Sequence, residues 1–204
     1  MITIVDYGMG NVGSLLNMFR YIGVAARSES NPDRLMESSS IVLPGVGAFH
    51  AAMEKINNTP RLRDTLNFKA LEEKVPVLGV CLGMQLLTSR SEEGCCDGLG
   101  WIDGETKLMP IVDDIKIPHM GWNFASINAP SPLFAGILSD SRYYFVHSYC
   151  VSVNNSKHSL TRSRYGIEFD SSIGRDNIFG VQFHPEKSHR YGMAVLKNFV
   201  ELTK

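Results

Sequence analysis

One cysteine in the sequence is placed to act as a nucleophile. Cys81 lies in the stretch LGVCLGMQ, where Gly79 and Gly83 give the pattern G-x-C-x-G after a continuous apolar run. This pattern is the thiol counterpart of the strand–turn–helix elbow that exposes a hydrolase nucleophile. Glycine two residues before and two residues after the thiol removes side chains that would clash in so sharp a turn. We therefore expect the turn to lift the thiol above a strand end and place it at a helix N-terminus, where the helix dipole favours the thiolate.

A base and an orienting carboxylate are available near the C-terminus. The stretch VQFHPEKS carries His184 and Glu186 on either side of Pro185. Residues two apart on an extended chain share a face, so we expect the imidazole and the carboxylate to lie side by side, with Pro185 holding the chain extended. Glu186 would fix the tautomer of the imidazole, and His184 would exchange a proton with Cys81 and the leaving group. Each motif alone also fits an ordinary core, but the two together predict a Cys-His-Glu triad.

Two segments could donate hydrogen bonds to a developing oxyanion. The backbone amide of Leu82 follows the thiol directly and would point to the place where the negative charge forms. Gly45, Val46 and Gly47 belong to the stretch VLPGVGAF, which follows an expected strand and should reach the same edge of the sheet. Such a glycine-rich loop suits an oxyanion hole or a mobile switch. A plain strand-to-helix turn explains its glycines equally well.

The N-terminal stretch VDYGMGNVGS matches the G-x-G-x-x-G pattern of dinucleotide-binding domains through Gly8, Gly10 and Gly13. Glu29 stands near the position at which such domains hold a ribose. The triad is chemistry that a dinucleotide-binding domain does not require, and we interpret Glu29, in the polar stretch RSESN, as a solvated charge. We expect no cofactor. Gly8, Gly10 and Asn11 should instead line the rim beside the active site and face a partner.

The composition is that of an ordinary globular enzyme. The 204 residues are 44% hydrophobic and 20% charged, and the length favours one domain over residues 1–204. The net charge of -1 gives no reason to expect nucleic acid or an anionic membrane as a partner. No apolar stretch reaches the ~20 residues of a membrane span, and the chain starts with a strand-like run without signal-peptide features. We therefore expect a cytoplasmic location.

The remaining cysteines and histidines form no metal-binding pattern. Cys95 and Cys96 are adjacent, Cys150 stands alone, and no C-x-x-C occurs, so we expect neither a disulfide framework nor a zinc site. We interpret these three cysteines as loop or half-buried thiols. The histidines other than His184 follow no metal-ligand spacing, and we assign none to a metal: His50, His119, His147, His158 and His189.

The elements that must position these residues alternate between strands and helices in the first half of the chain. Apolar runs predict strands at MITIVD, VAARSE, SSIVLPG and VPVLGV, and helical spacing predicts helices at 12–22, 48–56, 62–74 and from Met84. After Gly100 short β-rich stretches precede a closing helix at 188–203: GETKLMPIVDDIKIPHMGW, RYYFVHSYCVSV, HSLTRSRYGIEF and NIFGVQFHPE. We predict an α/β fold, a doubly wound and mostly parallel sheet with antiparallel strands added at its edge in the C-terminal half.

Together these motifs resemble class I glutamine amidotransferases, which have a flavodoxin-like fold, and among them the glutaminase subunits of imidazole glycerol phosphate synthases. The resemblance spans the chain through DYGMGN, LPGVGAF, GVCLGMQLL, SEEG, PHMGWN, YFVHSY and FGVQFHPEKS. It implies that Cys81 attacks the side-chain amide of glutamine, that ammonia leaves, and that water hydrolyses the γ-glutamyl thioester. It also implies which residues contact the bound glutamine: Gln85, Glu93, His147, Ser148 and Tyr149.

The resemblance further implies a partner. Ammonia would pass to a separate (β/α)8-barrel cyclase subunit, which closes an imidazole ring and releases an aminoimidazole carboxamide nucleotide. His119, Gly121, Trp122 and Asn123 of PHMGWN would lie near that interface, with core packing as the alternative for Trp122. Three other functions stay open: a paralogue that supplies ammonia to an amidino- or amino-sugar synthase for surface polysaccharide, an inactive regulatory subunit, and a hydrolase of γ-glutamyl peptides.

Overall fold

The computed structural model describes residues 1–112, 115–138 and 140–203. Within these ranges twelve strands form one sheet, in the order β2-β1-β3-β4-β14-β13-β11-β7-β5-β6, with β12 paired to β13 and β9 paired to β12. The first five strands in this order are mutually parallel. Their bounds are β2 (Ala26–Glu29), β1 (Ile2–Val5), β3 (Ile41–Gly45), β4 (Val77–Cys81) and β14 (Ile178–Val181).

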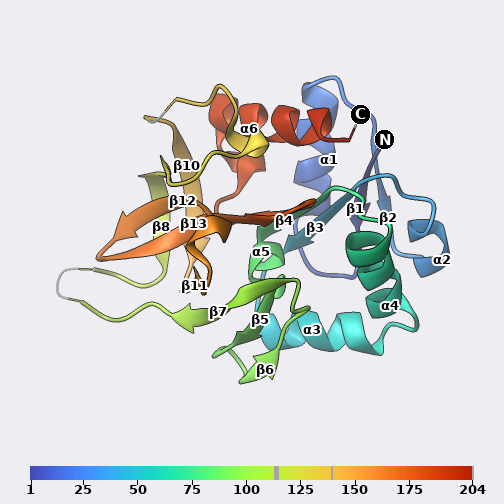
Figure 1. Cartoon of the computed structure of the whole chain (residues 1–204), viewed down its shortest axis with the longest axis horizontal. Helices are drawn as coiled ribbons and strands as arrows, with labels where there is room; N and C mark the ends of the chain where they lie inside the picture. Colours follow the sequence, from blue (N-terminus) through green and yellow to red (C-terminus); the bar gives the residue numbers. More distant parts are fainter. Residues whose placement is uncertain (113–114, 139, 204) are drawn as a thin grey trace.

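Helices cover both faces of this parallel part (Figure 1). On one face α1 (Val12–Tyr21) and α6 (His189–Glu201) bury Phe19 and Phe199 against the sheet. On the other face α3 (Phe49–Asn58) and α4 (Leu62–Asn67) pack around a second apolar cluster. The short helices are α2 (Pro32–Leu35) and α5 (Leu82–Leu86). The doubly wound architecture expected from the alternating pattern is confirmed.

The antiparallel extension is confirmed as well. The strands β13 (Ile167–Arg175), β11 (Tyr149–Val153) and β7 (Ile102–Leu108) continue the sheet in antiparallel pairs beyond β14. The remaining strands complete it: β12 (Ser159–Tyr165), β9 (Ser126–Ile127), β5 (Thr88–Ser91) and β6 (Cys96–Asp97). None of the described helices is long and apolar enough to cross a membrane.

Two expectations about the strands are wrong in detail. The strand in NIFGVQFHPE is not an antiparallel addition, because β14 is fully buried and pairs in parallel with β4. The strands β8 (His119–Phe124) and β10 (Arg142–His147) do not join the main sheet and pair with each other instead. Their burial alternates, since one face packs on the protein and the other is exposed. Asp113 and Asp114 of the predicted stretch before β8 lie outside the described residues.

The predicted helices differ from the observed ones mainly at their ends. The helix expected over 62–74 is α-helical to Asn67 and continues as a π-helical segment, Phe68–Glu72. The helix expected from Met84 already begins at Leu82. Three short 3-10 segments also occur among the described residues: Pro132–Phe134, Ser156–His158 and Pro185–Lys187.

Candidate active site

The thiol of Cys81 stands on the sharp turn that the sequence predicts. Cys81 ends β4 and precedes α5, and its backbone φ of 56° lies in the left-handed region that L residues rarely adopt. A Cβ atom added to Gly79 would lie 2.6 Å from the carbonyl oxygen of Gly83, and one added to Gly83 would overlap the carbonyl oxygen of Leu43. The requirement for glycine on both sides of the nucleophile is therefore confirmed, although at Gly83 the obstacle is the neighbouring strand β3 and not the turn itself.

His184 and Glu186 form a close buried pair. The Nδ1 atom of His184 lies 2.8 Å from Oε1 of Glu186, and the two side chains are only 4% and 2% exposed. The predicted route to this contact is wrong. The strand β14 ends at Val181, and Glu186 belongs to a 3-10 turn that begins at Pro185, so the carboxylate reaches the imidazole across a turn rather than along an extended chain.

The electrostatics of His184 favour its protonated form. Burial lowers the pKa of the imidazole, but hydrogen bonds with Cys81 and with Glu186 outweigh this effect and raise the pKa above its ordinary value. Since Glu186 occupies Nδ1, Nε2 is left for the interaction with Cys81. This arrangement can take a proton from the thiol and stabilise the resulting imidazolium beside a thiolate.

A cavity of about 360 Å³ opens over the thiol. This volume lies within the range of small-molecule sites. Most of the predicted site residues line it: Val46, Gly47, Cys81, Leu82, Gln85, Glu93, His147, Ser148, Tyr149 and His184. Gly45 pairs in register with Cys81 across β3 and β4, and Glu186 lines a separate cavity formed with residues of α1 and α6. The sequence did not indicate three further lining residues, Pro118, Val146 and Lys187.

A buried glutamine that the sequence motifs do not indicate lies beside the thiol. Gln182 is fully buried, and its Nε2 lies 3.8 Å from the sulfur of Cys81. Its Oε1 accepts a hydrogen bond of 3.1 Å from Nε2 of Gln85, which also donates to the carbonyl of Tyr149. The only signal in the sequence was a single polar residue in the otherwise apolar run before His184.

Glu93 is held in place by a helix that is distant in sequence. Its Oε2 accepts a 2.7 Å hydrogen bond from the backbone amide of Phe49, the first residue of α3. The residue before that helix, Ala48, provides no side-chain cap, so Glu93 supplies the missing acceptor. This bond fixes the carboxylate at one side of the cavity.

The loop after β1 packs against the glycine-rich segment at residues 44–47. The hydroxyl of Tyr7 donates a 2.7 Å hydrogen bond to the carbonyl oxygen of Pro44, and a Cβ atom added to Gly10 would lie 2.8 Å from Cβ of Pro44. Gly10 thus lies near the edge of the sheet that carries the Cys81 thiol, and Asn11 caps α1. The prediction for Glu29 is wrong: it ends β2, is buried, and accepts hydrogen bonds from the amides of residues 30 and 31.

The residues predicted at a partner interface separate into two groups. His119 is only 2% exposed, so its side chain cannot meet a partner directly, and the prediction for it is corrected. The amide of Asn123 also forms its hydrogen bonds within the chain. Trp122 is 46% exposed and stacks on the ring of His189, which excludes the alternative of core packing. The reason is the two-residue period of β8, which turns alternate residues to opposite faces.

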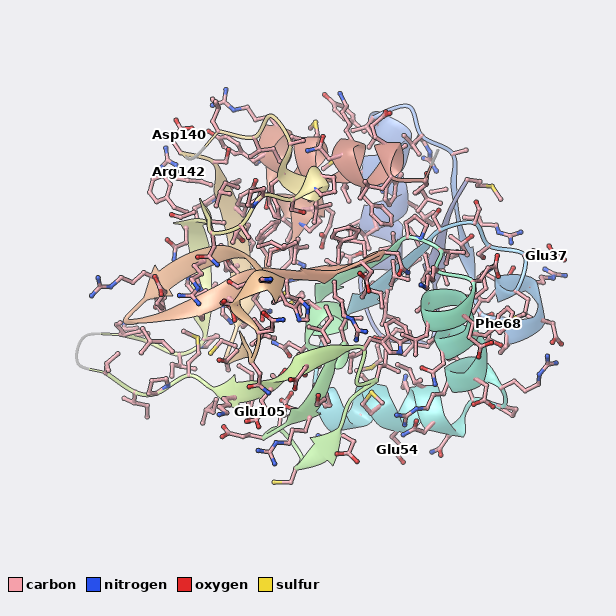
Figure 2. The ribbon with its side chains drawn as sticks, in the orientation of Figure 1. Glu37, Glu54, Phe68, Glu105, Asp140 and Arg142 are labelled. Carbon is pink, nitrogen blue, oxygen red and sulfur yellow. The ribbon has the colours of Figure 1, made fainter. Side chains whose placement is uncertain are left out.

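The outward faces of β8 and β10 form an exposed apolar surface. Trp122 contacts Tyr144 edge to face, and the large apolar side chains on the same face of β8 are also exposed: Met120 and Phe124. We term these four residues the β8–β10 face. Figure 2 shows Arg142, the first residue of β10, at the opposite end of the molecule from Phe68. Exposed apolar side chains gathered on one face are typical of interaction sites.

The other cysteines take no part in this site. All four cysteines are free thiols, with Cys95 exposed and Cys96 half-buried as expected. Cys150 differs from its prediction because it lies in β11 and is buried, and burial raises the pKa of its thiol to about 11. Within the described ranges no three His, Cys, Asp or Glu side chains are grouped to hold a metal ion.

Comparison with known proteins identifies the family. Class I glutamine amidotransferases match residues 3–202. The protein named imidazole glycerol phosphate synthase subunit HisH 2 in Methanococcus maripaludis is 46% identical over 201 residues, which cover 98% of this chain and 99% of that protein. The protein of the same name in Pseudomonas aeruginosa is 45% identical over 202 residues, which cover 99% of this chain and 100% of that protein.

Solved structures share the fold at low sequence identity. The structure of PurLQS from Thermotoga maritima superposes with a TM-score of 0.72 at 17% identity, covering 100% of this chain and 98% of that one. A glutamine amidotransferase from the same organism gives a TM-score of 0.64 at 18% identity, covering 98% of this chain and 80% of that one. The motifs, the elbow and the full-length match agree: this chain belongs to the class I glutamine amidotransferase family.

Proposed function

We propose that the chain is the glutaminase subunit of an imidazole glycerol phosphate synthase. The observation that carries the proposal is the strained turn at Cys81 beside the buried His184–Glu186 pair, in a cavity that the predicted glutamine contacts line. The names of the relatives, synthase subunits 45% and 46% identical to the chain, support the choice of acceptor reaction.

The proposed reaction has two halves. The thiolate of Cys81 attacks the side-chain amide carbon of glutamine, and the oxyanion accepts hydrogen bonds from the Leu82 amide and from the Gly45–Gly47 segment. The protonated His184 gives its proton to the leaving nitrogen, and ammonia departs. His184 then takes a proton from water, which attacks the γ-glutamyl thioester and releases glutamate and the thiol. Glu186 stabilises the imidazolium in both halves.

The cavity walls suggest how glutamine is oriented. Gln85, Glu93 and the Ser148–Tyr149 segment line the cavity on the side of α5 and β11. The carboxylate of Glu93 suits the α-ammonium group of glutamine, and backbone groups of Ser148 and Tyr149 suit its α-carboxylate and amide. We assign His147 a supporting role, because both of its ring nitrogens are already bonded within the chain.

The acceptor requires a partner. At neutral pH free ammonia is mostly ammonium, which is not nucleophilic, so it must pass directly to an enzyme docked on this chain. We propose that a (β/α)8-barrel cyclase subunit docks on the β8–β10 face and the rim at Gly8, Gly10 and Asn11. There the ammonia closes the ring of imidazole glycerol phosphate and releases the aminoimidazole carboxamide nucleotide.

Reconstitution with the cyclase subunit from the same organism tests this function. The pair should convert its nucleotide substrate with glutamine as nitrogen source, and glutamate release should be weak without the partner and its ligand. Conversion with ammonium salts only would indicate an inactive regulatory subunit. Glutamine hydrolysis that couples only to an amidino- or amino-sugar synthase would indicate the paralogous function. Equal turnover with and without any partner, on γ-glutamyl peptides, would indicate a free-standing hydrolase.

A further inference from the structure

Two buried histidines connect the β8–β10 sheet to the wall of the active-site cavity. His119 and His147 face each other across the two strands, with Nδ1 of His119 2.9 Å from Nε2 of His147. The ring of His119 is also stacked between Phe145 and Tyr165, at centroid distances of 4.8 and 4.1 Å. The imidazole therefore has little freedom to turn, and its hydrogen bonds are set by its position.

The cavity end of the pair fixes which nitrogens carry protons. Nδ1 of His147 lies 2.8 Å from the carbonyl oxygen of Tyr149, which can only accept, so this nitrogen must donate. Burial lowers the pKa of His147 to about 3 and that of His119 to about 4, so both rings are neutral at physiological pH. Nε2 of His147 is then an acceptor, and it receives the Nδ1–H of His119.

The other end of the histidine pair, at His119, gives the same assignment of protons independently. The amide of Asn123 is oriented by two backbone groups, because its Oδ1 accepts from the amide of Phe124 at 2.8 Å and its Nδ2 donates to the carbonyl of Arg164 at 3.0 Å. The same Nδ2 lies 3.3 Å from Nε2 of His119. This nitrogen of His119 must therefore accept, which leaves the proton on Nδ1.

The chain of hydrogen bonds continues to the nucleophile. The carbonyl of Tyr149 that receives His147 also receives Nε2 of Gln85, which bonds Gln182 beside the sulfur of Cys81. Tyr149 and Gln85 both line the cavity. The outward residues of the same strand, β8, belong to the exposed β8–β10 face.

We propose that His119 is a positioning residue for glutamine binding, which acts through His147 to hold the Ser148–Tyr149 wall and Gln85 in the geometry that fits the substrate. The proposal rests on the proposed glutaminase function. It assigns a role to a buried residue that touches neither substrate nor partner, and it places that residue directly behind the surface on which a partner would dock.

A pair of substitutions in the holoenzyme tests this role. His119→Phe keeps an aromatic ring in the stack but removes the Nδ1–H, which leaves Nε2 of His147 buried without a donor. It should raise the KM for glutamine about ten-fold and change kcat by less than about three-fold, since the loss affects substrate placement. His119→Asn supplies an amide nitrogen near the position of Nδ1 and should restore most of the KM. His158→Phe, in the 3-10 segment at 156–158, is the matched control and should leave both constants unchanged.

The outcomes separate this proposal from the proposed function. If the wild-type complex releases no glutamate, the glutaminase function itself fails. If the wild type is active and His119→Phe has the wild-type KM, or if His119→Asn is no better than His119→Phe, the positioning role is refuted.

Nitrogen NMR of the wild-type chain adds a measurement that requires neither activity nor a folded variant. Both His119 and His147 should be neutral Nδ1–H tautomers at pH 7. A proton on Nε2 of either ring would break the chain of donors and acceptors and overturn the proposal.

Discussion

Replacing Glu186 with glutamine removes one charge from the triad and little else. The carboxylate accepts a 2.8 Å hydrogen bond from His184 and is buried, so the substitution changes a charge-assisted bond into a neutral one at constant size. Hydrogen bonds to charged groups contribute about 1.5–3 kcal/mol. Two charges 4 Å apart attract by about 4 kcal/mol at an effective dielectric constant of 20. These bounds convert to a loss of about 10- to 1000-fold in the rate that depends on the imidazolium.

The assay is glutamate release by the complete complex at saturating glutamine. We expect kcat of Glu186→Gln to fall about 100-fold with little change in KM, because Glu186 does not line the cavity over the thiol. Glu168→Gln is a matched control, since its partner Arg162 lies at the surface and the ion pair is exposed. A Glu186→Gln enzyme within about two-fold of the wild-type kcat would refute the assigned role of the carboxylate.

Three further predictions concern the elbow, the docking face and the buried histidines. Gly79→Ala should destabilise the fold by at least about 3 kcal/mol in urea denaturation, because its Cβ would meet backbone at 2.6 Å, whereas Gly13→Ala has open space and should not destabilise it. Trp122→Ala should weaken cyclase binding at least about 30-fold by calorimetry, whereas Phe68→Ala, at the opposite end of the molecule from β10, should leave binding unchanged. Burial holds the pKa of His119 near 4 in the folded chain, so between about pH 6.5 and pH 4 the unfolded chain binds a proton that the folded chain does not. The contribution of the neutral imidazole to stability is therefore fully present above about pH 6.5 and is lost as the pH falls toward 4. Lowering the pH from 7 to 5 should therefore decrease the free energy of unfolding of His119→Phe by about 1–2 kcal/mol less than it decreases that of the wild type. The same pH dependence in both proteins would contradict the assignment.

The nucleophile and its turn could be predicted from the sequence because their geometry is local. The spacing of Gly79 and Cys81 reflects a steric limit within the turn, since a Cβ on Gly79 would meet the backbone of Gly83, whereas the limit at Gly83 comes from Leu43 on the neighbouring strand β3. The pairing of His184 with Glu186 was also predicted, but from the wrong backbone conformation. Pro185 starts a 3-10 turn instead of extending the chain, and this segment has partners distant along the chain, since the amide of His184 donates to the carbonyl of Tyr144.

The residues that the sequence did not reveal are those whose contacts are distant along the chain. Gln182 meets Cys81 across 101 residues, and Tyr7 meets Pro44 across 37. The misplacement of His119 has a different cause. The prediction assigns the whole motif PHMGWN to an interface, whereas the two-residue period of a strand separates His119 and Asn123 from Trp122. The observed burial follows that period, with His119 buried, Asn123 half-buried and Trp122 exposed.

In the proposed reaction the thiol of Cys81 carries out the hydrolysis of glutamine. The measurement that tests it most directly is the rate of glutamate release by Cys81→Ala in complex with the cyclase subunit, with ammonium-dependent conversion as a check that the complex remains intact. We expect a rate at least about 10⁴-fold below that of the wild type and undiminished conversion with ammonium salts. Glutamate release by Cys81→Ala within a few-fold of the wild-type rate would contradict it.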